Sequence, residues 1–245
     1  MSLLPGFHSL TEWLVATTIV VLAAALQGSA GFGFSLCCAP FLAWLDPALV
    51  PAPLILACTL LLSLTVWRER SAVDLLGIGW LLGGRVPGTV LGALALAALS
   101  ERALTTGLGL VVLVSVGISL KRAHFERRPR LMLAVGVLSG FMGVTSAIDG
   151  PPVAILYQHE RGALVRSTLA TYFLIGAAMS IATLTLLGRI GGREVELALG
   201  LWPGIALGFA GSRWLGRWLD RGRTRAAVLV VAAFAGLSAM LRGLA

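Results

Sequence analysis

The sequence predicts an all-α integral membrane protein made of two repeats of about five membrane passes each. The first observation is composition: of 245 residues, 58% are hydrophobic and 12% charged, whereas soluble domains carry about 25% charged residues. So much apolar surface cannot be buried in one soluble core. The net charge of +8 comes almost entirely from arginines between apolar stretches, which favours a membrane protein over a nucleic-acid-binding one.

The second observation is an internal duplication. A Pro-Gly-x3-Gly motif at 87–92 recurs at 203–208, 116 residues later, and an Ala-Leu-Val triplet at 48–50 recurs at 163–165, 115 residues later. A glycine-rich break at 28–34 has a counterpart ending at 150–152. Duplicated halves with broken hydrophobic segments in corresponding places are typical of secondary transporters. One membrane domain is therefore expected, with a first repeat at 1–120, a basic cytoplasmic linker at 121–130 and a second repeat at 131–245.

Eight apolar blocks follow one another along the chain. A helix needs about 20 residues to cross the hydrocarbon core, and six of the blocks fit one span each. The first and the fifth are longer and are interrupted by glycines, the fifth also by a Pro-Pro pair. The blocks are 10–45, 49–66, 74–98, 103–120, 131–158, 164–187, 195–212 and 225–241.

The two long blocks leave two topologies open. If each crosses once, the chain has eight spans and both halves point the same way. If each crosses and returns, there are ten passes and the halves are inverted. The basic loop at 121–130 is expected in the cytoplasm; the ten-pass model then also places the five arginines between 213 and 225 inside, whereas the eight-span model places them outside. Inverted repeats with both termini outside are favoured, and the short segments 33–45 and 150–158 either span fully or are re-entrant.

The two breaks are expected to carry the chemistry. Backbone in the hydrocarbon core must be hydrogen-bonded internally, so helices break there mainly where the free groups line a cavity or meet a ligand. A helix that starts after a break presents free N–H groups and the positive end of its dipole, which suits an anion. The alternative is that the glycines only allow helices to pack closely. For the Pro-Gly-x3-Gly pair, packing and a kink are the expected roles.

Arg85 and Asp149 are the two charged residues that stand out within apolar blocks. A charge deep in the membrane is seldom kept without a partner or an aqueous cavity. Arg85 is expected to bind the anion or gate its path, to pair with Asp149, or to lie at a span boundary. Asp149 is expected to carry a proton for coupling, because burial disfavours a charged carboxylate, or to cap the following helix.

Hydroxyl and amide side chains flank both breaks. Their polar groups are expected to bond either a substrate oxygen or their own helix backbone. No catalytic residue, metal site or cofactor is expected, because no common enzyme motif occurs and the histidines lie in loops or at segment ends. The residues expected to bind substrate are Gln27, Gly28, Ser29, Gly31, Gly33, Arg85, Thr145, Ser146 and Gly150, with Asp149 assigned to proton coupling.

The sequence around the breaks resembles a known family. Residues 140–153 read Gly-Phe-Met-Gly-Val-Thr-Ser-Ala-Ile-Asp-Gly-Pro-Pro-Val, similar to the second-half signature of the sulfite exporter TauE/SafE family, typically Gly-Phe-Leu-Gly-Gly-Leu-Thr-Gly-Ile-Gly-Gly-Pro-Pro-Val. Residues 28–34, Gly-Ser-Ala-Gly-Phe-Gly-Phe, resemble its first-repeat motif. The resemblance implies a multi-pass permease of the bacterial inner membrane for sulfite, sulfonates or related organic anions. Ala147 and Asp149 depart from it, since the family usually has glycine there.

The leading function hypothesis is a secondary transporter of small anions that works by alternating access and is driven by a proton gradient or by anion exchange. The alternatives are a drug/metabolite-type exporter, against which the Gly-Pro-Pro break speaks, and a membrane-embedded lipid-phosphate enzyme, for which too few buried polar residues are available. The expected partners are a small anionic substrate, protons and the lipid bilayer, with no nucleic acid. A homo-oligomer and the direction of transport are left open.

Overall fold

The computed structural model describes residues 6–69, 73–98, 126–160 and 162–218, together with scattered residues within 100–117 and 230–240. In these ranges all regular secondary structure is helical. The segments expected at 103–120 and 225–241 fall largely outside the described residues. The same holds for the first half of the linker, residues 121–125, and for the side chains of the arginine cluster beyond Arg213.

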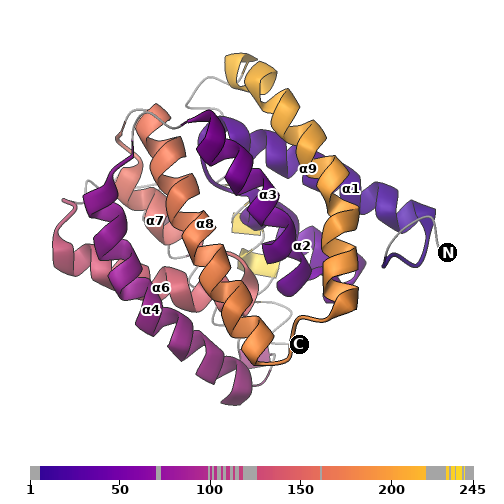
Figure 1. The fold of residues 1–245 in the computed structure, drawn as a ribbon, viewed down its shortest axis with the longest axis horizontal. Helices are drawn as coiled ribbons and strands as arrows, with labels where there is room; N and C mark the ends of the chain where they lie inside the picture. The colour runs from indigo at the N-terminus through magenta and orange to yellow at the C-terminus, as the bar shows by residue number, and fades with distance from the viewer. Residues whose placement is uncertain are drawn as a thin grey trace.

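Each of the two long apolar blocks forms two helices separated by a break (Figure 1). Five described helices are long and apolar enough to cross a membrane: α1, α4, α6, α8 and most of α9. The chain is therefore a multi-pass membrane protein, and its described residues contain only helices. The elements are α1 (Leu10–Ala30), α2 (Phe34–Leu45), the 3-10 turn η1 (Pro47–Leu49), α3 (Ala52–Arg68), α4 (Leu75–Ala98), α6 (Pro129–Ser146), α7 (Gly150–Tyr157), α8 (Gly162–Leu186) and α9 (Gly192–Trp218).

Left-handed backbone conformations make the breaks. Gly31, with φ of 92°, ends α1, and Gly33, with φ of 110°, precedes α2. Residues with a side chain rarely adopt these backbone angles, so glycine fits both positions. In the second half the left-handed residue is Ala147, with φ of 63°. Helix α6 has already ended at Ser146, so Gly150 and the two prolines begin the next helix and do not end the preceding one.

The most extensive helix contacts join the two halves. Helix α4 packs along α6, and α9 packs along α1. A Cβ on Gly88 of α4 would overlap the carbonyl of Val137, and one on Gly208 of α9 would overlap the carbonyl of Val21. The packing role expected for the Pro-Gly-x3-Gly motifs is confirmed. The first helix of each half thus packs against the motif-bearing helix of the other half.

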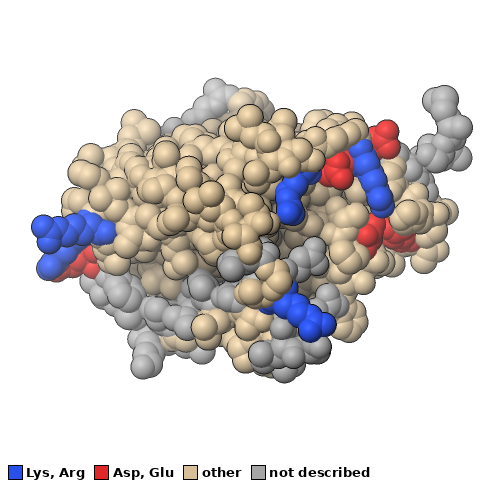
Figure 2. Space-filling model, turned by 90° about the horizontal axis from the view of Figure 1, so that it is seen from below, with Lys and Arg blue, Asp and Glu red and all other residues tan. Residues whose placement is uncertain are grey.

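Charged groups join helix ends at two separate places. At one, the loop between α3 and α4 meets the second half: Glu69 accepts a hydrogen bond from Arg166 (2.9 Å), and Asp74 lies 3.2 Å from Arg127. At the other, Asp46 after α2 lies 3.8 Å from Arg193 at the start of α9 and 4.0 Å from His8. Figure 2 shows charged side chains at the left end and in the right half of the molecule, with a wide uncharged surface between them.

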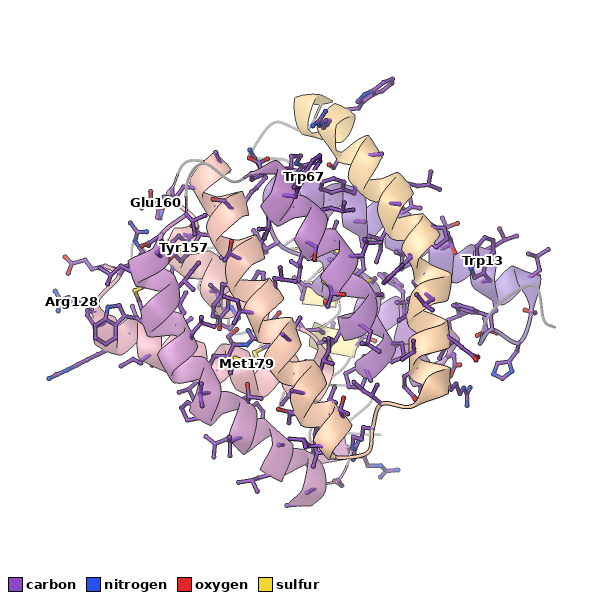
Figure 3. All side chains as sticks on the ribbon, in the orientation of Figure 1. Trp13, Trp67, Arg128, Tyr157, Glu160 and Met179 are labelled. Carbon is purple, nitrogen blue, oxygen red and sulfur yellow. The ribbon has the colours of Figure 1, made fainter. Side chains whose placement is uncertain are left out.

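The end of α7 lies at the first of these places. Figure 3 shows Tyr157 and Glu160 at the same end of the molecule as Arg128, with Trp13 far from them. Tyr157 is fully buried, and its hydroxyl donates to Asp74 (3.0 Å). Trp13 donates to the carbonyl of Gly200 (2.8 Å), which ties α1 to α9.

Candidate functional site: a cavity between the two helix breaks

The two breaks face one small cavity of about 40 Å³. A water molecule needs about 10–15 Å³ of such volume, so the cavity has room for about three waters. Contributions come from both halves of the chain. The lining residues are Gln27 from α1, Gly33 at the first break, Phe34, Ser35 and Leu36 from the start of α2, Ile55, Cys58 and Leu62 from α3, Arg85 from α4, Gly143 from α6, Ala147, Ile148 and Asp149 at the second break, Gly150 from the start of α7, and Phe173, Ala177 and Ser180 from α8.

Arg85 lies within α4 and is only 1% exposed. Its Nη2 lies 2.7 Å from Oδ2 of Asp149, and its Nη1 donates to Oγ of Ser139 (3.2 Å). Its guanidinium carbon lies 5.0 Å from the ring centre of Tyr172, a cation–π distance. Of the alternatives drawn from the sequence, a span boundary is wrong and the pair with Asp149 is formed. The Nε–H group of this arginine is buried and has no acceptor in the described part of the chain.

Asp149 stands at the N-cap position of α7, yet its side chain makes no capping hydrogen bond. The capping alternative drawn from the sequence is therefore wrong. An N-cap side chain accepts from the N–H of the second or third helical residue; here these are Pro151 and Pro152, which have no N–H. The carboxylate is left to face Arg85, while Ser139 holds the backbone by donating to the Asp149 carbonyl (3.1 Å).

Two glycines make room for this ion pair. A Cβ on Gly176 of α8 would overlap Cζ and Nε of Arg85, and one on Gly143 of α6 would come within 2.7 Å of its Nη2. The same hypothetical Cβ of Gly143 would approach Asp149 to 3.3 Å. Both helices therefore come close to the charged pair because they carry no side chain at these positions.

The first break is closed by a neutral group. Gln27 near the end of α1 is 4% exposed, and its Oε1 accepts a hydrogen bond from the backbone N–H of Phe34 (2.8 Å). This bond satisfies one of the free N–H groups at the start of α2. Gln27 and Gly33 both line the cavity.

Five of the ten residues predicted from the sequence do not line the cavity. The hydroxyls of Ser29, Thr145 and Ser146 donate to backbone carbonyls of their own helices, the second of the two roles weighed for them. Gly28 packs against Ser212, and its carbonyl accepts from Arg68. Gly31 packs against Arg166. Gln27, Gly33, Arg85, Asp149 and Gly150 do line it.

Sequence reasoning missed the α8 side of the site. Ser180 lines the cavity, is 1% exposed, and has a buried hydroxyl with no partner among the described residues. Tyr172, Gly176 and Ser180 recur every fourth residue, a spacing that places them on one helix face. A serine in an apolar span is a weak signal, so the sequence alone does not single out this helix face. Within the described ranges, no group of three or more His, Cys, Asp or Glu residues could hold a metal ion.

Comparison with known proteins identifies the family. No curated protein matches the chain, and no solved structure matches it. A family model does match, over residues 16–239, which is nearly the whole chain. The resemblance seen at the two breaks therefore extends across both halves, and the chain belongs to the sulfite exporter TauE/SafE family.

Proposed function

We propose that this protein is a secondary transporter that carries sulfite, sulfonates or related small organic anions across the bacterial inner membrane. The observation that carries the proposal is the buried arginine in a cavity between two broken helices. A buried charge in a membrane segment usually marks a substrate or ion path, and discontinuous helices form the binding sites of many secondary transporters. Membership of the TauE/SafE family favours this class of substrate.

The course of the described helices supports inverted repeats. Helix α1 begins at the end where His8 and Asp46 lie, whereas α6 begins at the opposite end, where Arg127 meets Asp74. The second helix of each half then returns toward the end from which the first came: Asp46 follows α2, and Tyr157 closes α7 beside Asp74. The two breaks thus approach the cavity from opposite sides. Ten passes follow if the segments expected at 103–120 and 225–241 each cross once.

The size and lining of the cavity favour a small anion. Its volume of about 40 Å³ suits a few heavy atoms and is too small for a drug-sized metabolite or a lipid headgroup. Arg85 provides the positive charge, and Gly33 and Gly150 lie at the starts of α2 and α7. Rocking of the two halves around this fixed site would open it to one side of the membrane and then to the other.

Asp149 gives the transporter a route for coupling to protons. While it is ionised, it neutralises Arg85 at 2.7 Å. Protonation would weaken this pair and leave the arginine charge available for an anion. Anion and proton would then move together, so that a proton gradient drives the flux.

Flux through purified protein in liposomes tests the proposal. Sulfite, sulfoacetate, methanesulfonate and chloride are supplied with and without an inward pH gradient, beside protein-free vesicles and vesicles with inserted Arg85→Ala protein. Saturable flux of at least one sulfur oxyanion that rises with the gradient and is lost in the variant is expected. Absence of flux for the whole panel in the wild type would overturn the proposal.

A further inference from the structure

We infer that the transported anion binds the edge of Arg85 formed by Nε and Nη2, together with the hydroxyl of Ser180, and that Asp149 holds part of this edge when no anion is bound. The inference rests on the proposed function and deepens it, because it names the donor atoms and the class of anion they select. Two buried groups that have no partner among the described residues carry it, Nε of Arg85 and the hydroxyl of Ser180, and both residues line the cavity.

The guanidinium of Arg85 is incompletely used. Its Nη1 donates to Ser139, and its Nη2 is bound to a single carboxylate oxygen of Asp149. Nε has no acceptor. An arginine usually binds a carboxylate or phosphate through two parallel N–H donors. Asp149 engages one donor of the Nε/Nη2 pair, so this edge retains an open donor for an oxyanion.

Helix α8 lies directly against this guanidinium. The atoms closest to a Cβ built on Gly176 are Cζ, Nε and Nη2 of Arg85. Glycine at 176 therefore lets the helix backbone approach the guanidinium, where any side chain would displace it. Ser180 lies one helical turn further along the same face, and its hydroxyl is buried without a partner among the described residues. A buried hydroxyl without a partner is costly, and an anion oxygen would satisfy it.

Charge balance makes Asp149 and the anion competitors. The charged and titratable residues around Asp149 are Arg85 on α4, Tyr172 on α8 and Cys58 on α3, of which Arg85 carries the positive charge. Cys58 and Asp149 share the cavity lining with the neutral Gln27. One positive charge accommodates one anion at so buried a position. An arriving anion therefore takes the place of the carboxylate, which leaves Arg85 once it has accepted a proton.

The geometry selects anions that present two oxygens side by side. Sulfite, sulfonates and carboxylates offer two acceptors to the Nε/Nη2 edge, and a third sulfonate oxygen can accept from Ser180. Chloride is a single spherical acceptor and cannot use the edge in this way. We therefore expect methanesulfonate to bind more tightly than chloride, and the preference to depend on Ser180.

The test is the KM for methanesulfonate in liposomes containing wild type, Ser180→Ala or Ser167→Ala. Ser167 is a matched control, since it is a buried serine on the same helix whose hydroxyl donates to the backbone of its own helix. Loss of a hydrogen bond to a charged group should raise KM about tenfold or more in Ser180→Ala. The control should stay within about twofold of wild type.

The variant Asp149→Asn, assayed in the same way, tests the competition between Asp149 and the anion. Without the resident carboxylate, KM at alkaline pH should fall below that of the wild type, and its dependence on pH should flatten. Wild-type flux with equal KM in Ser180→Ala and Ser167→Ala would overturn the donor assignment. An unchanged KM and pH profile in Asp149→Asn would overturn the competition. Absence of wild-type flux for every anion would instead count against the proposed function.

Discussion

The two breaks share a backbone design and differ in how they are closed. The first turns through left-handed Gly31 and Gly33, and the neutral amide of Gln27 binds the N–H of Phe34. The second turns through Ala147, and the prolines after Gly150 offer no N–H that Asp149 could cap. The Asp149 carboxylate instead pairs with Arg85 of the other half. The first break is therefore stabilised by a neutral hydrogen bond within its own half, whereas the second depends on a charge from the other half. Protonation of Asp149 can change the second arrangement and not the first.

The largest expected effect comes from removing the charge at the second break. Arg85→Ala should lower flux at least about 100-fold and lower the unfolding temperature, because breaking a buried pair by removing one partner costs about 3–5 kcal/mol. Arg85→Lys keeps the charge and loses the two-donor edge, so it should retain a fraction of the flux. Flux assays and thermal unfolding in detergent measure both quantities.

A double variant separates stability from transport in this experiment. Arg85→Ala combined with Asp149→Asn leaves no unpaired charge, so it should recover most of the lost unfolding temperature and none of the flux. Flux returning with stability would mean that Arg85 serves only to hold the fold.

The next effect concerns the space that α8 leaves for the guanidinium. Gly176→Ala introduces a Cβ that would overlap Arg85, so it should lower the unfolding temperature by several degrees and the flux about tenfold or more. Gly79→Ala on α4 is the control, since a Cβ there meets nothing within 4 Å. It should be neutral or slightly stabilising, because alanine favours helix over glycine by about 1 kcal/mol. Equal behaviour of the two variants would remove Gly176 from the site.

The first break should respond differently. Gln27→Ala leaves the N–H of Phe34 without its acceptor, which should cost about 1–3 kcal/mol of stability. The KM for methanesulfonate and its pH dependence should change by no more than about twofold, because the charge at the second break is intact. A large change in the pH profile would show that both breaks take part in coupling.

The smallest effects are expected at three hydroxyls near the breaks. Ser29→Ala, Thr145→Ala and Ser146→Ala each remove a bond to a carbonyl of the same helix, and such bonds contribute little to helix stability. Each KM should stay within about twofold of wild type. A tenfold rise in any of them would place that hydroxyl in the substrate path.

Glycine and proline patterns predicted where the helices break, because few residues tolerate the left-handed turns at Gly31 and Gly33. The pair of Arg85 and Asp149 could also be predicted as one alternative, since isolated charges in apolar segments have few possible partners. The failure of Asp149 to cap its helix could also have been read from the two prolines that follow it. These features depend on local chemistry, which the sequence displays directly.

Other features depend on how distant segments meet. Gly28 and Gly33 look alike in the sequence, yet one packs against Ser212 and the other lines the cavity. Ser180 and Ser167 lie on the same helix, and the face each presents decides that only Ser180 lines the cavity. Such distinctions arise from tertiary packing, which one sequence does not reveal.

Proton movement during anion flux tests the central claim most directly. Liposomes loaded with a pH-sensitive dye report the protons that accompany methanesulfonate, a strong acid that brings no proton of its own at neutral pH. The account predicts proton entry with the anion in wild type, and anion flux without proton entry in Asp149→Asn. Equal proton entry per anion in both proteins would contradict the assignment of coupling to Asp149.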